Sequence, residues 1–319
     1  MKKALTIMLL VLFAVSTVFA GGAKEKAADG TFKVGIVQLV QHVALDAATQ
    51  GFRDALKAEL GDKVVFDEQN ASGEINNCAT IVNGFVSSKV DLIMANATPA
   101  VQAAASATST IPVLGTSVTH YAVALDIDKW TGTVGTNVSG TSDLAPLDEQ
   151  AKMIQEWFPN AKKVGLLFCS AEANSIFQVE EVEAYLKKAG LQTQKFSFTD
   201  TNDIASVTQK AADWSDVIYI PTDNTAASNT EAIANILVAS KTPAICGEEG
   251  ICKGCGIATL SISYYDLGVT TGKMAAKILK GEANVSEMPI EFAPVTKKYN
   301  ADMCKTFGIT PVAGYEAIN

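Results

Sequence analysis

Hydrophobic and polar residues follow two alternating spacings along most of the chain. Residues 32–40 form a run rich in valine and isoleucine, which predicts a strand buried on both faces. Directly afterwards, apolar residues from Leu45 to Leu60 recur at steps of three and four, which predicts an amphipathic helix. The same change of spacing repeats up to residue 116 and begins again near residue 144. Strands that alternate with helices of this length predict parallel sheets with helices on both faces.

The repeated pattern divides the chain into two halves, and one sheet in each half is the simplest arrangement that it allows. Further strands are expected at residues 64–66, 91–95, 112–116, 164–168, 192–198, 217–220, 244–246 and 257–260. Further helices are expected at residues 75–85, 99–107, 144–158, 175–189, 203–212, 226–238, 264–280 and 301–307. The predicted fold class is therefore α/β, with two doubly wound parallel-sheet lobes joined by a hinge.

The first 30 residues depart from this pattern. Residues 1–20 begin with lysines, continue as an apolar stretch and end in small residues, which predicts a secretory signal peptide. Residues 21–30 are rich in glycine, alanine, lysine and glutamate, and are expected to form a flexible leader. No cysteine follows the apolar stretch, so a lipid anchor is not expected. The predicted location is the periplasm.

Charge narrows the range of ligands. The chain has 25 lysine and arginine residues against 34 aspartate and glutamate residues, a balance that disfavours nucleic-acid binding. Arg53 is the only arginine, so almost no side chain could grip a phosphate or a second carboxylate in a bidentate manner. Nucleotides, sugar phosphates and dicarboxylates are therefore disfavoured as ligands.

Open α/β sheets bind ligands at the carboxyl ends of their strands, where loops lead into helix N-termini. Small polar residues and carboxylates follow several of the predicted strands. Two such edges facing each other across a hinge would enclose a small zwitterion. The candidate ligand-binding residues of the first half are Gln38, His42, Thr98, Thr119 and Tyr121. Those of the second half are Ser170, Glu172, Asn174, Ser175, Thr222, Asp223, Asn224 and Glu248.

Residues 218–228 form the most informative of these edges, because Thr222, Asp223 and Asn224 follow a strand and lead into a helix. We expect Asp223 to bind an ammonium group of the ligand, helped by other carboxylates of the same half, and Thr225 to cap the helix. A ligand carboxylate is expected to meet hydroxyl groups and helix N-termini.

Enzyme motifs are missing from the sequence. It contains no glycine-rich nucleotide loop, no G-x-S-x-G elbow and no H-E-x-x-H motif, so neither an enzyme activity nor a cofactor is expected. Only two histidines are present, and no metal site is expected. Cys246, Cys252 and Cys255 form a cluster in which a bridge from Cys255 to either of the others is expected ahead of a metal, with reduced thiols as an equal alternative.

Several short segments, taken in order, resemble one family. They are VGIVQ at 34–38, NATPA at 96–100, PTDNT at 221–225, GEEG at 247–250 and YYDLG at 264–268. They resemble the exported substrate-binding proteins of ABC transporters in the tryptophan/tyrosine-binding (TrpX-like) family, from about Phe32 to the end of the chain.

This resemblance implies a type I periplasmic-binding fold with three crossovers between the lobes. By analogy the first lobe is 31–118 plus 262–284, and the second is 119–261 plus 285–319. The resemblance also implies a monomer that captures a free amino acid, aromatic or large and apolar, for an ABC permease in the inner membrane. Tyr121 or Phe177 could stack on an aromatic ligand.

Two departures from the family pattern leave the ligand open. Thr119-His120-Tyr121 stands where relatives usually have Asp-Pro, and the cysteine cluster replaces residues that relatives usually fill with Val, Lys and Gly. A sugar- or nucleoside-binding protein of the same fold, or a periplasmic sensor subunit, is the alternative.

Overall fold

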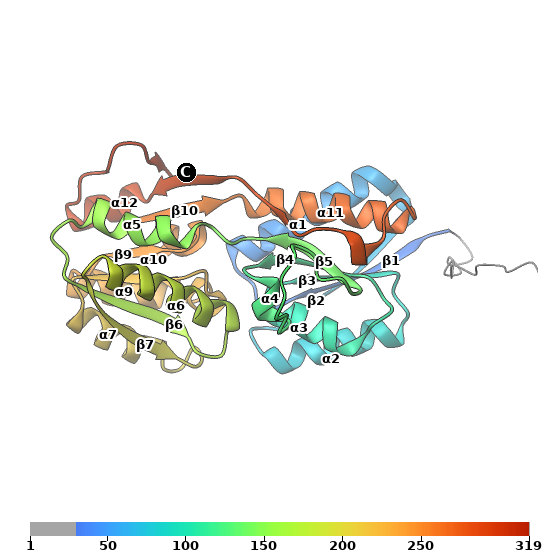
Figure 1. Cartoon of the computed structure of the whole chain (residues 1–319), viewed down its shortest axis with the longest axis horizontal. Coiled ribbons are helices and arrows are strands. Elements are labelled where there is room, and N and C mark those ends of the chain that lie inside the picture. Colours follow the sequence, from blue (N-terminus) through green and yellow to red (C-terminus); the bar gives the residue numbers. More distant parts are fainter. Residues whose placement is uncertain (1–29, 319) are drawn as a thin grey trace, which may run out of the picture.

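The computed structural model describes residues 30–318, which fold into two α/β lobes that lie side by side (Figure 1). Each lobe is built on one twisted sheet with helices on both faces, so the predicted fold class is confirmed. The predicted signal peptide and residues 21–29 of the predicted leader lie outside the described residues. No helix among residues 30–318 is both long enough and apolar enough to span a membrane.

The first lobe contains a six-stranded sheet in the order β11-β5-β4-β3-β1-β2, with all neighbours parallel. Its strands are β1 (Phe32–Gln38), β2 (Val64–Asn70), β3 (Leu92–Asn96), β4 (Val113–Val118), β5 (Val138–Ser142) and β11 (Glu291–Phe292). Apolar residues of α1 (Val43–Leu60) and α11 (Tyr264–Leu279) pack on one face of this sheet. Those of α2 (Ile75–Ser87) and α3 (Thr98–Ala107) pack on the other.

The second lobe contains a seven-stranded sheet in the order β13-β12-β10-β9-β8-β6-β7. Its strands are β6 (Lys163–Cys169), β7 (Gln192–Phe198), β8 (Val217–Ile220), β9 (Ala244–Cys246), β10 (Ala258–Ile262), β12 (Val295–Tyr299) and β13 (Glu316–Ala317). Only the β10–β12 pair is antiparallel among the described neighbours. Helices α5 (Leu147–Trp157) and α6 (Ala173–Lys188) cover one face, and α7 (Ile204–Trp214) and α9 (Thr230–Ser240) cover the other. Helix α12 (Ala301–Phe307) lies where the sequence predicts it.

Several elements lie where the sequence pattern predicts none, among them α4 (Tyr121–Ala124), β5 and α10 (Glu249–Cys255). Strand β5 reads Val-Ser-Gly-Thr-Ser and has only one large apolar residue, although all five residues are buried. Helix α10 contains two glycines, which disfavour helix. The predicted helix 226–238 is divided into α8 (Asn224–Ala227) and α9.

Sheet membership corrects the predicted lobe boundaries at two places. Strand β5 pairs with β4, and β11 pairs with β5, so both belong to the sheet of the first lobe. The analogy had assigned both segments to the second lobe. We propose that the three crossovers lie at 143–146, at Ser263 and at 293–294, between elements of different sheets.

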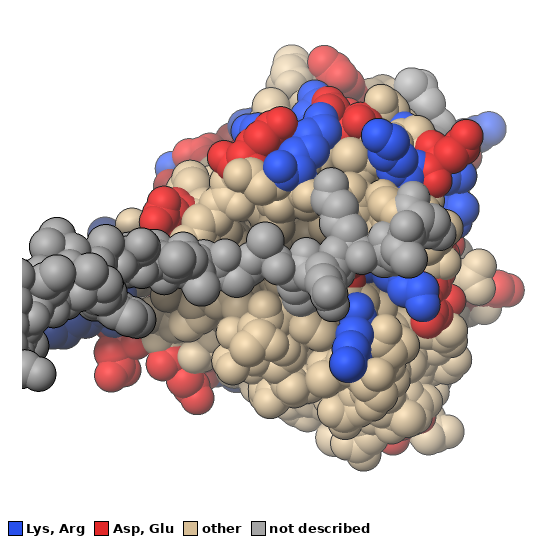
Figure 2. All heavy atoms as spheres, turned by 90° about the vertical axis from the view of Figure 1, so that its right-hand side faces the viewer, with Lys and Arg blue, Asp and Glu red and all other residues tan. Residues whose placement is uncertain are grey.

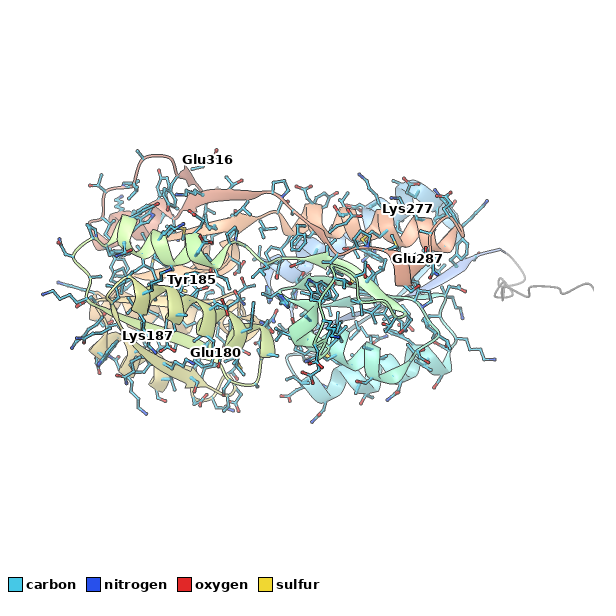
Figure 3. All side chains as sticks on the ribbon, viewed as in Figure 1. Glu180, Tyr185, Lys187, Lys277, Glu287 and Glu316 are labelled. Carbon is cyan, nitrogen blue, oxygen red and sulfur yellow. The ribbon has the colours of Figure 1, made fainter. Side chains whose placement is uncertain are left out.

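The outer surface carries charges of both signs. Figure 2 shows the outer end of the first lobe, where basic and acidic side chains are interspersed in the upper part and the lower part is largely uncharged. Helices α2 and α3 contain no charged residue, in agreement with this view. In the second lobe, Glu180 and Lys187 of α6 lie on the outer surface (Figure 3).

All six cysteines are buried and free, so the expected bridge from Cys255 is absent and the alternative of reduced thiols is the one observed. Cys246 ends β9, and Cys252 and Cys255 lie on α10, which packs against that strand. Burial raises the pKa of the Cys252 thiol, which keeps it protonated. Among residues 30–318, no group of histidine, cysteine and acidic residues could hold a metal ion.

Candidate functional site

A narrow cavity of about 10 Å³ lies between the two lobes, at the carboxyl ends of strands from both sheets. This is roughly the space that one water molecule needs. Among the side chains that line it are seven of the thirteen predicted site residues, namely His42, Thr119, Asn174, Thr222, Asp223, Asn224 and Glu248. The remaining lining residues are Leu45, Ser117, Asp143, Ala227 and Tyr264. No lysine or arginine is among them.

Asp143 lies in the crossover between β5 and α5, and only 4% of it is exposed. The hydroxyl of Tyr264 donates a hydrogen bond to Asp143 Oδ2 at 2.9 Å, whereas Asp143 Oδ1 has no partner among the described residues. Burial raises the pKa of Asp143 to about 6, although the hydroxyls of Tyr264 and Thr119 act in the opposite direction. The crossover therefore brings a carboxylate into the cavity with one oxygen available.

Asp223 is the cap of α8, a role that the sequence analysis had given to Thr225. Its Oδ1 accepts a hydrogen bond from the N–H of Ala226 at 2.8 Å, and its Oδ2 accepts one from the N–H of Cys169 at 2.7 Å. Burial, followed by the negative charge of Glu172, raises the pKa of Asp223. Both oxygens are thus engaged by the second lobe itself.

Glu172 and Glu248 are also bound by their own lobe. Glu172 accepts hydrogen bonds from the N–H groups of Asn224 and Thr225 and from both of their side chains, at 2.6–3.1 Å. Glu248 caps α10, because its carboxylate accepts from the N–H groups of Gly250 and Ile251. Burial raises the pKa of Glu248 to about 7, against the effect of these two donors.

The wall from the first lobe has a different character. His42 is the N-cap residue of α1, but no side chain caps this 18-residue helix. The Nε2 atom of His42 lies 3.4 Å from Asn224 Oδ1, a contact that joins the two lobes. Burial lowers the pKa of His42, which favours its neutral form. Ser117 is 6% exposed, and its Oγ has no partner among the described residues.

The other predicted site residues do not line this cavity. Gln38 binds Asp46 and Thr49 within the first lobe, and Thr98 is a buried first residue of α3 that supplies no cap. Tyr121 packs in the core, where its hydroxyl donates to the carbonyl of Thr141 at 3.1 Å. The remaining three are Ser170, which is exposed, Ser175, which is buried beside Asn174, and Glu172, which lines the neighbouring pocket.

Asp143, Tyr264 and Ser117 line this cavity, although the prediction did not select them. Asp143 follows β5, which has too few apolar residues to be recognised. Tyr264 begins a correctly predicted helix, but the lobe crossover before it was needed to place it in the cavity. Ser117 follows the predicted strand 112–116 by one residue, so the rule that selected Thr119 also covers it.

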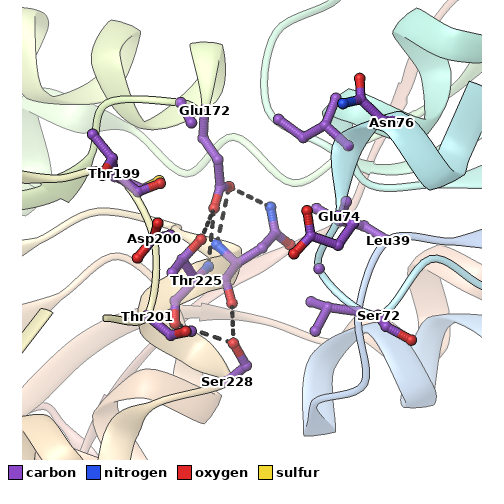
Figure 4. Close-up of a pocket in the computed structure, with 16 residues that line it drawn as sticks. Leu39, Ser72, Glu74, Asn76, Glu172, Thr199, Asp200, Thr201, Thr225 and Ser228 are labelled. Carbon is purple, nitrogen blue, oxygen red and sulfur yellow. Dashed lines mark hydrogen bonds between the residues drawn. The ribbon is translucent and has the colours of Figure 1, made fainter. Parts of the chain in front are cut away.

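A larger pocket of about 310 Å³ forms the mouth of the interlobe space (Figure 4). Figure 4 shows Glu172, Thr225 and Ser228 of the second lobe facing Ser72 and Glu74 of the first. Leu39, Val40 and Ile75 add apolar surface from the first lobe. Asn224 lines both this pocket and the narrow cavity, so it lies where the two spaces adjoin.

Two α/β lobes with a polar cavity between them define a two-lobed binding protein. A family model described as "ABC transporter substrate binding protein" matches residues 33–310, and the chain belongs to this family. The resemblance drawn from short segments is thereby confirmed.

Three relatives are informative. A tyrosine-binding protein of Clostridioides difficile (strain R20291) is 34% identical over 260 residues, which are 81% of this chain and 75% of that protein. A Streptococcus pneumoniae ABC domain in complex with L-Trp is 35% identical, covers 90% of this chain and 100% of its own, and has a TM-score of 0.85. A ligand-free, open substrate-binding protein with adhesive properties from Clostridium difficile is also 35% identical, covers 91% and 99%, and has a TM-score of 0.68.

Proposed function

We propose that this protein captures a free aromatic amino acid, such as tryptophan or tyrosine, between its two lobes and delivers it to the permease of an ABC importer. The observation that carries the proposal is the interlobe cavity, whose walls come from both lobes and include buried polar atoms that have no partner within residues 30–318. Buried polar groups are normally hydrogen-bonded, so such a cavity favours a polar ligand. The family and the tyrosine-binding relative support an amino acid as that ligand.

The arrangement of the lobes supports capture by closure. The L-Trp complex and the open relative have the same identity to this chain and almost the same coverage, but their TM-scores are 0.85 and 0.68. The lobes of this chain are thus arranged more like those of the complex. A ligand that touches both lobes binds the closed form better and shifts the population toward it.

The size of the site fits an aromatic amino acid only if its two spaces combine. The narrow cavity alone has about 10 Å³, and the mouth pocket has about 310 Å³. Rotation of Asn224, which lines both spaces, and of His42, which contacts it, would join them. The charged end of the ligand would then occupy the cavity, and its side chain would extend toward Leu39, Val40 and Ile75.

The same proposal covers the setting of the protein. We infer a periplasmic, non-lipidated monomer that is exported by residues 1–20, has no enzymatic activity and needs no cofactor or metal. The mixed charges in Figure 2 give no basic face on that side for nucleic acid, and the sequence has one arginine. An ABC permease is the partner that the family implies.

Ligand-dependent thermal unfolding tests this proposal. Purified protein is heated with each of the 20 amino acids, and with glucose, ribose and adenosine as controls. A ligand at one hundred times its Kd should raise the free energy of unfolding by about 2.7 kcal/mol. We expect this shift with tryptophan or tyrosine. A shift with a sugar or nucleoside, and with no amino acid, would overturn the proposal in favour of the alternative ligand class.

A further inference from the structure

Three buried side-chain atoms in the interlobe cavity have no hydrogen-bond partner among the described residues. They are Ser117 Oγ, Asp143 Oδ1 and Asn174 Oδ1. Ser117 is 6% exposed, and Asp143 and Asn174 are each 4% exposed. Leaving a polar atom buried without a partner costs free energy, so these three atoms mark where a ligand completes the site.

Asp143 differs from the other acidic residues around the cavity. Both oxygens of Asp223 accept backbone N–H groups, and both oxygens of Glu248 do so as well. Glu172 is bound by the side chains and N–H groups of Asn224 and Thr225. Asp143 accepts the Tyr264 hydroxyl on Oδ2, and the Thr119 hydroxyl also acts on this carboxylate, but Oδ1 has no partner among the described residues. It is therefore the carboxylate that has an oxygen available for an ammonium group.

Asn174 adds a second acceptor. Its Nδ2 atom donates to the carbonyl of Thr222 at 3.1 Å and lies 3.2 Å from Glu172 Oε2, which fixes the orientation of the amide. Its Oδ1 atom is consequently left for a donor on the ligand. An ammonium group has three N–H donors and no acceptor, so two such oxygens suit it.

The donors for a ligand carboxylate lie on the other side of the cavity. Helices α8 and α10 direct their first turns toward acids of the second lobe, and those N–H groups are already bound by Asp223, Glu172 and Glu248. Helix α1 has no side-chain cap, and its residues His42 and Leu45 line the cavity beside Ser117. A helix N-terminus and a hydroxyl group can bind a carboxylate without a basic side chain.

We propose that Asp143 is the residue that selects ligands with a free α-ammonium group, which it binds together with Asn174, while the ligand carboxylate faces Ser117 and the N-terminus of α1. This inference rests on the proposed function and assigns an orientation to its ligand. It replaces Asp223, the residue selected from the sequence, as the ammonium partner. It also means that deaminated or N-acylated analogues of the ligand are excluded.

The inference is tested by calorimetric titration of the full chain with two ligand series. One contains L-tryptophan, tryptamine, indole-3-propionate and N-acetyl-L-tryptophan, and the other contains the matching tyrosine compounds. The wild-type protein should bind indole-3-propionate and N-acetyl-L-tryptophan about ten- to a hundredfold more weakly than L-tryptophan. This is the range expected for a lost hydrogen bond to a charged group. Tight binding of indole-3-propionate by the wild-type protein would overturn the inference without any variant.

The variant Asp143→Asn keeps the shape of the side chain and removes its charge. It should bind L-tryptophan roughly ten- to a hundredfold more weakly and should lose most of its preference for L-tryptophan over indole-3-propionate. The control Asp148→Asn removes the same charge from the exposed surface of α5, and it should keep both the affinity and the preference.

The outcomes separate the two proposals. If the wild-type protein binds L-tryptophan or L-tyrosine and Asp143→Asn retains the preference for the ammonium group, the inference is wrong and the proposed function stands. If the wild-type protein binds no free amino acid, the proposed function fails and this inference fails with it.

Discussion

The two lobes present different chemistry to the cavity between them. The second lobe contributes Asp223 and Glu248, with Glu172 in the neighbouring pocket, but its own backbone N–H groups bind all three. The first lobe contributes neutral residues, an uncapped helix and a hydroxyl group without a partner. A count of charges would therefore place the ligand's ammonium on the second lobe, whereas the hydrogen bonds leave Asp143, in the crossover, as its partner. A charged side chain near a site can bind a ligand only where other groups of the protein do not already occupy its hydrogen-bonding atoms.

The largest expected effect is on stability. It concerns α1, the helix of the first lobe whose N-terminal residues line the cavity. Helices α1 and α11 pack so closely that a Cβ atom at Gly268 would lie 2.0 Å from the carbonyl oxygen of Ala48. Gly268→Ala should therefore lower the free energy of unfolding by about 3 kcal/mol, because backbone must move. Urea unfolding measures this change.

Gly84→Ala is the matched control within the same lobe. A Cβ atom at this position of α2 meets nothing within 4 Å, so the variant should be as stable as the wild type or more stable by up to about 1 kcal/mol. If Gly268→Ala unfolds at the same urea concentration as the wild type, the close packing of α1 on α11 is not what positions the first wall.

The next effect is a pH dependence of stability that follows from the burial of Asp143. The pKa of Asp143 is raised from 3.8 to about 6, so its protonated form stabilises the folded protein below about pH 4 and this contribution is lost as pH rises to about 6. The Asp143→Asn side chain cannot ionise, so the stability of this variant does not fall in this way as pH rises. Without ligand, the variant should gain about 2–3 kcal/mol relative to the wild type between pH 4 and pH 7.

Urea unfolding of both proteins across this pH range measures the difference, in which the effects of other titrating groups largely cancel. Equal pH dependence of the two proteins would mean that Asp143 is not a buried acid in solution.

Glu172→Gln tests whether the second lobe uses its acids for structure. The substitution replaces a carboxylate that accepts four hydrogen bonds from Asn224 and Thr225, and it should lower the free energy of unfolding by about 2 kcal/mol. The preference for ligands with an ammonium group should persist, because Asp143 is unchanged.

Glu180→Gln on the exposed side of α6, the helix that begins directly after Glu172, serves as the control and should be neutral. A stable Glu172→Gln protein that no longer distinguishes L-tryptophan from indole-3-propionate would mean that Glu172 of the second lobe recognises the ammonium group.

The smallest expected effect on ligand binding belongs to Tyr121, which the sequence had suggested as a stacking residue. Tyr121→Phe removes a buried hydrogen bond to the carbonyl of Thr141 and should lower the free energy of unfolding by about 1 kcal/mol. The Kd for L-tryptophan should stay within about twofold of the wild type, since this ring lies in the core. A large loss of affinity in a variant of normal stability would mean that Tyr121 contacts the ligand.

The sequence predicts most of the fold because long segments such as 45–60 and 264–280 have apolar residues at clear helical spacing. It misses β5. The Ser-Gly-Thr-Ser segment of this strand is buried because the strand lies inside the sheet, although the segment itself is not apolar. That one strand carries Asp143 into the cavity, so missing the strand also loses the residue that now defines the ligand's orientation.

The candidate site is predicted in outline for a similar reason. Strand ends mark the loops that meet, and they bring His42, Asn174 and Glu248 to one cavity. They do not show which polar atoms already form hydrogen bonds within the protein. Asp223 looks free in the sequence, yet its two oxygens are taken by residues 169 and 226, one of which lies 54 positions away.

A crystal structure of the protein with bound L-tryptophan or L-tyrosine would show which group of the ligand lies on Asp143. We expect the ligand between the lobes, with its ammonium nitrogen at about 2.8 Å from Asp143 Oδ1 and its carboxylate directed toward Ser117 and the N-terminus of α1. A ligand in the reverse orientation, with its ammonium on Asp223 or Glu248, would contradict this expectation.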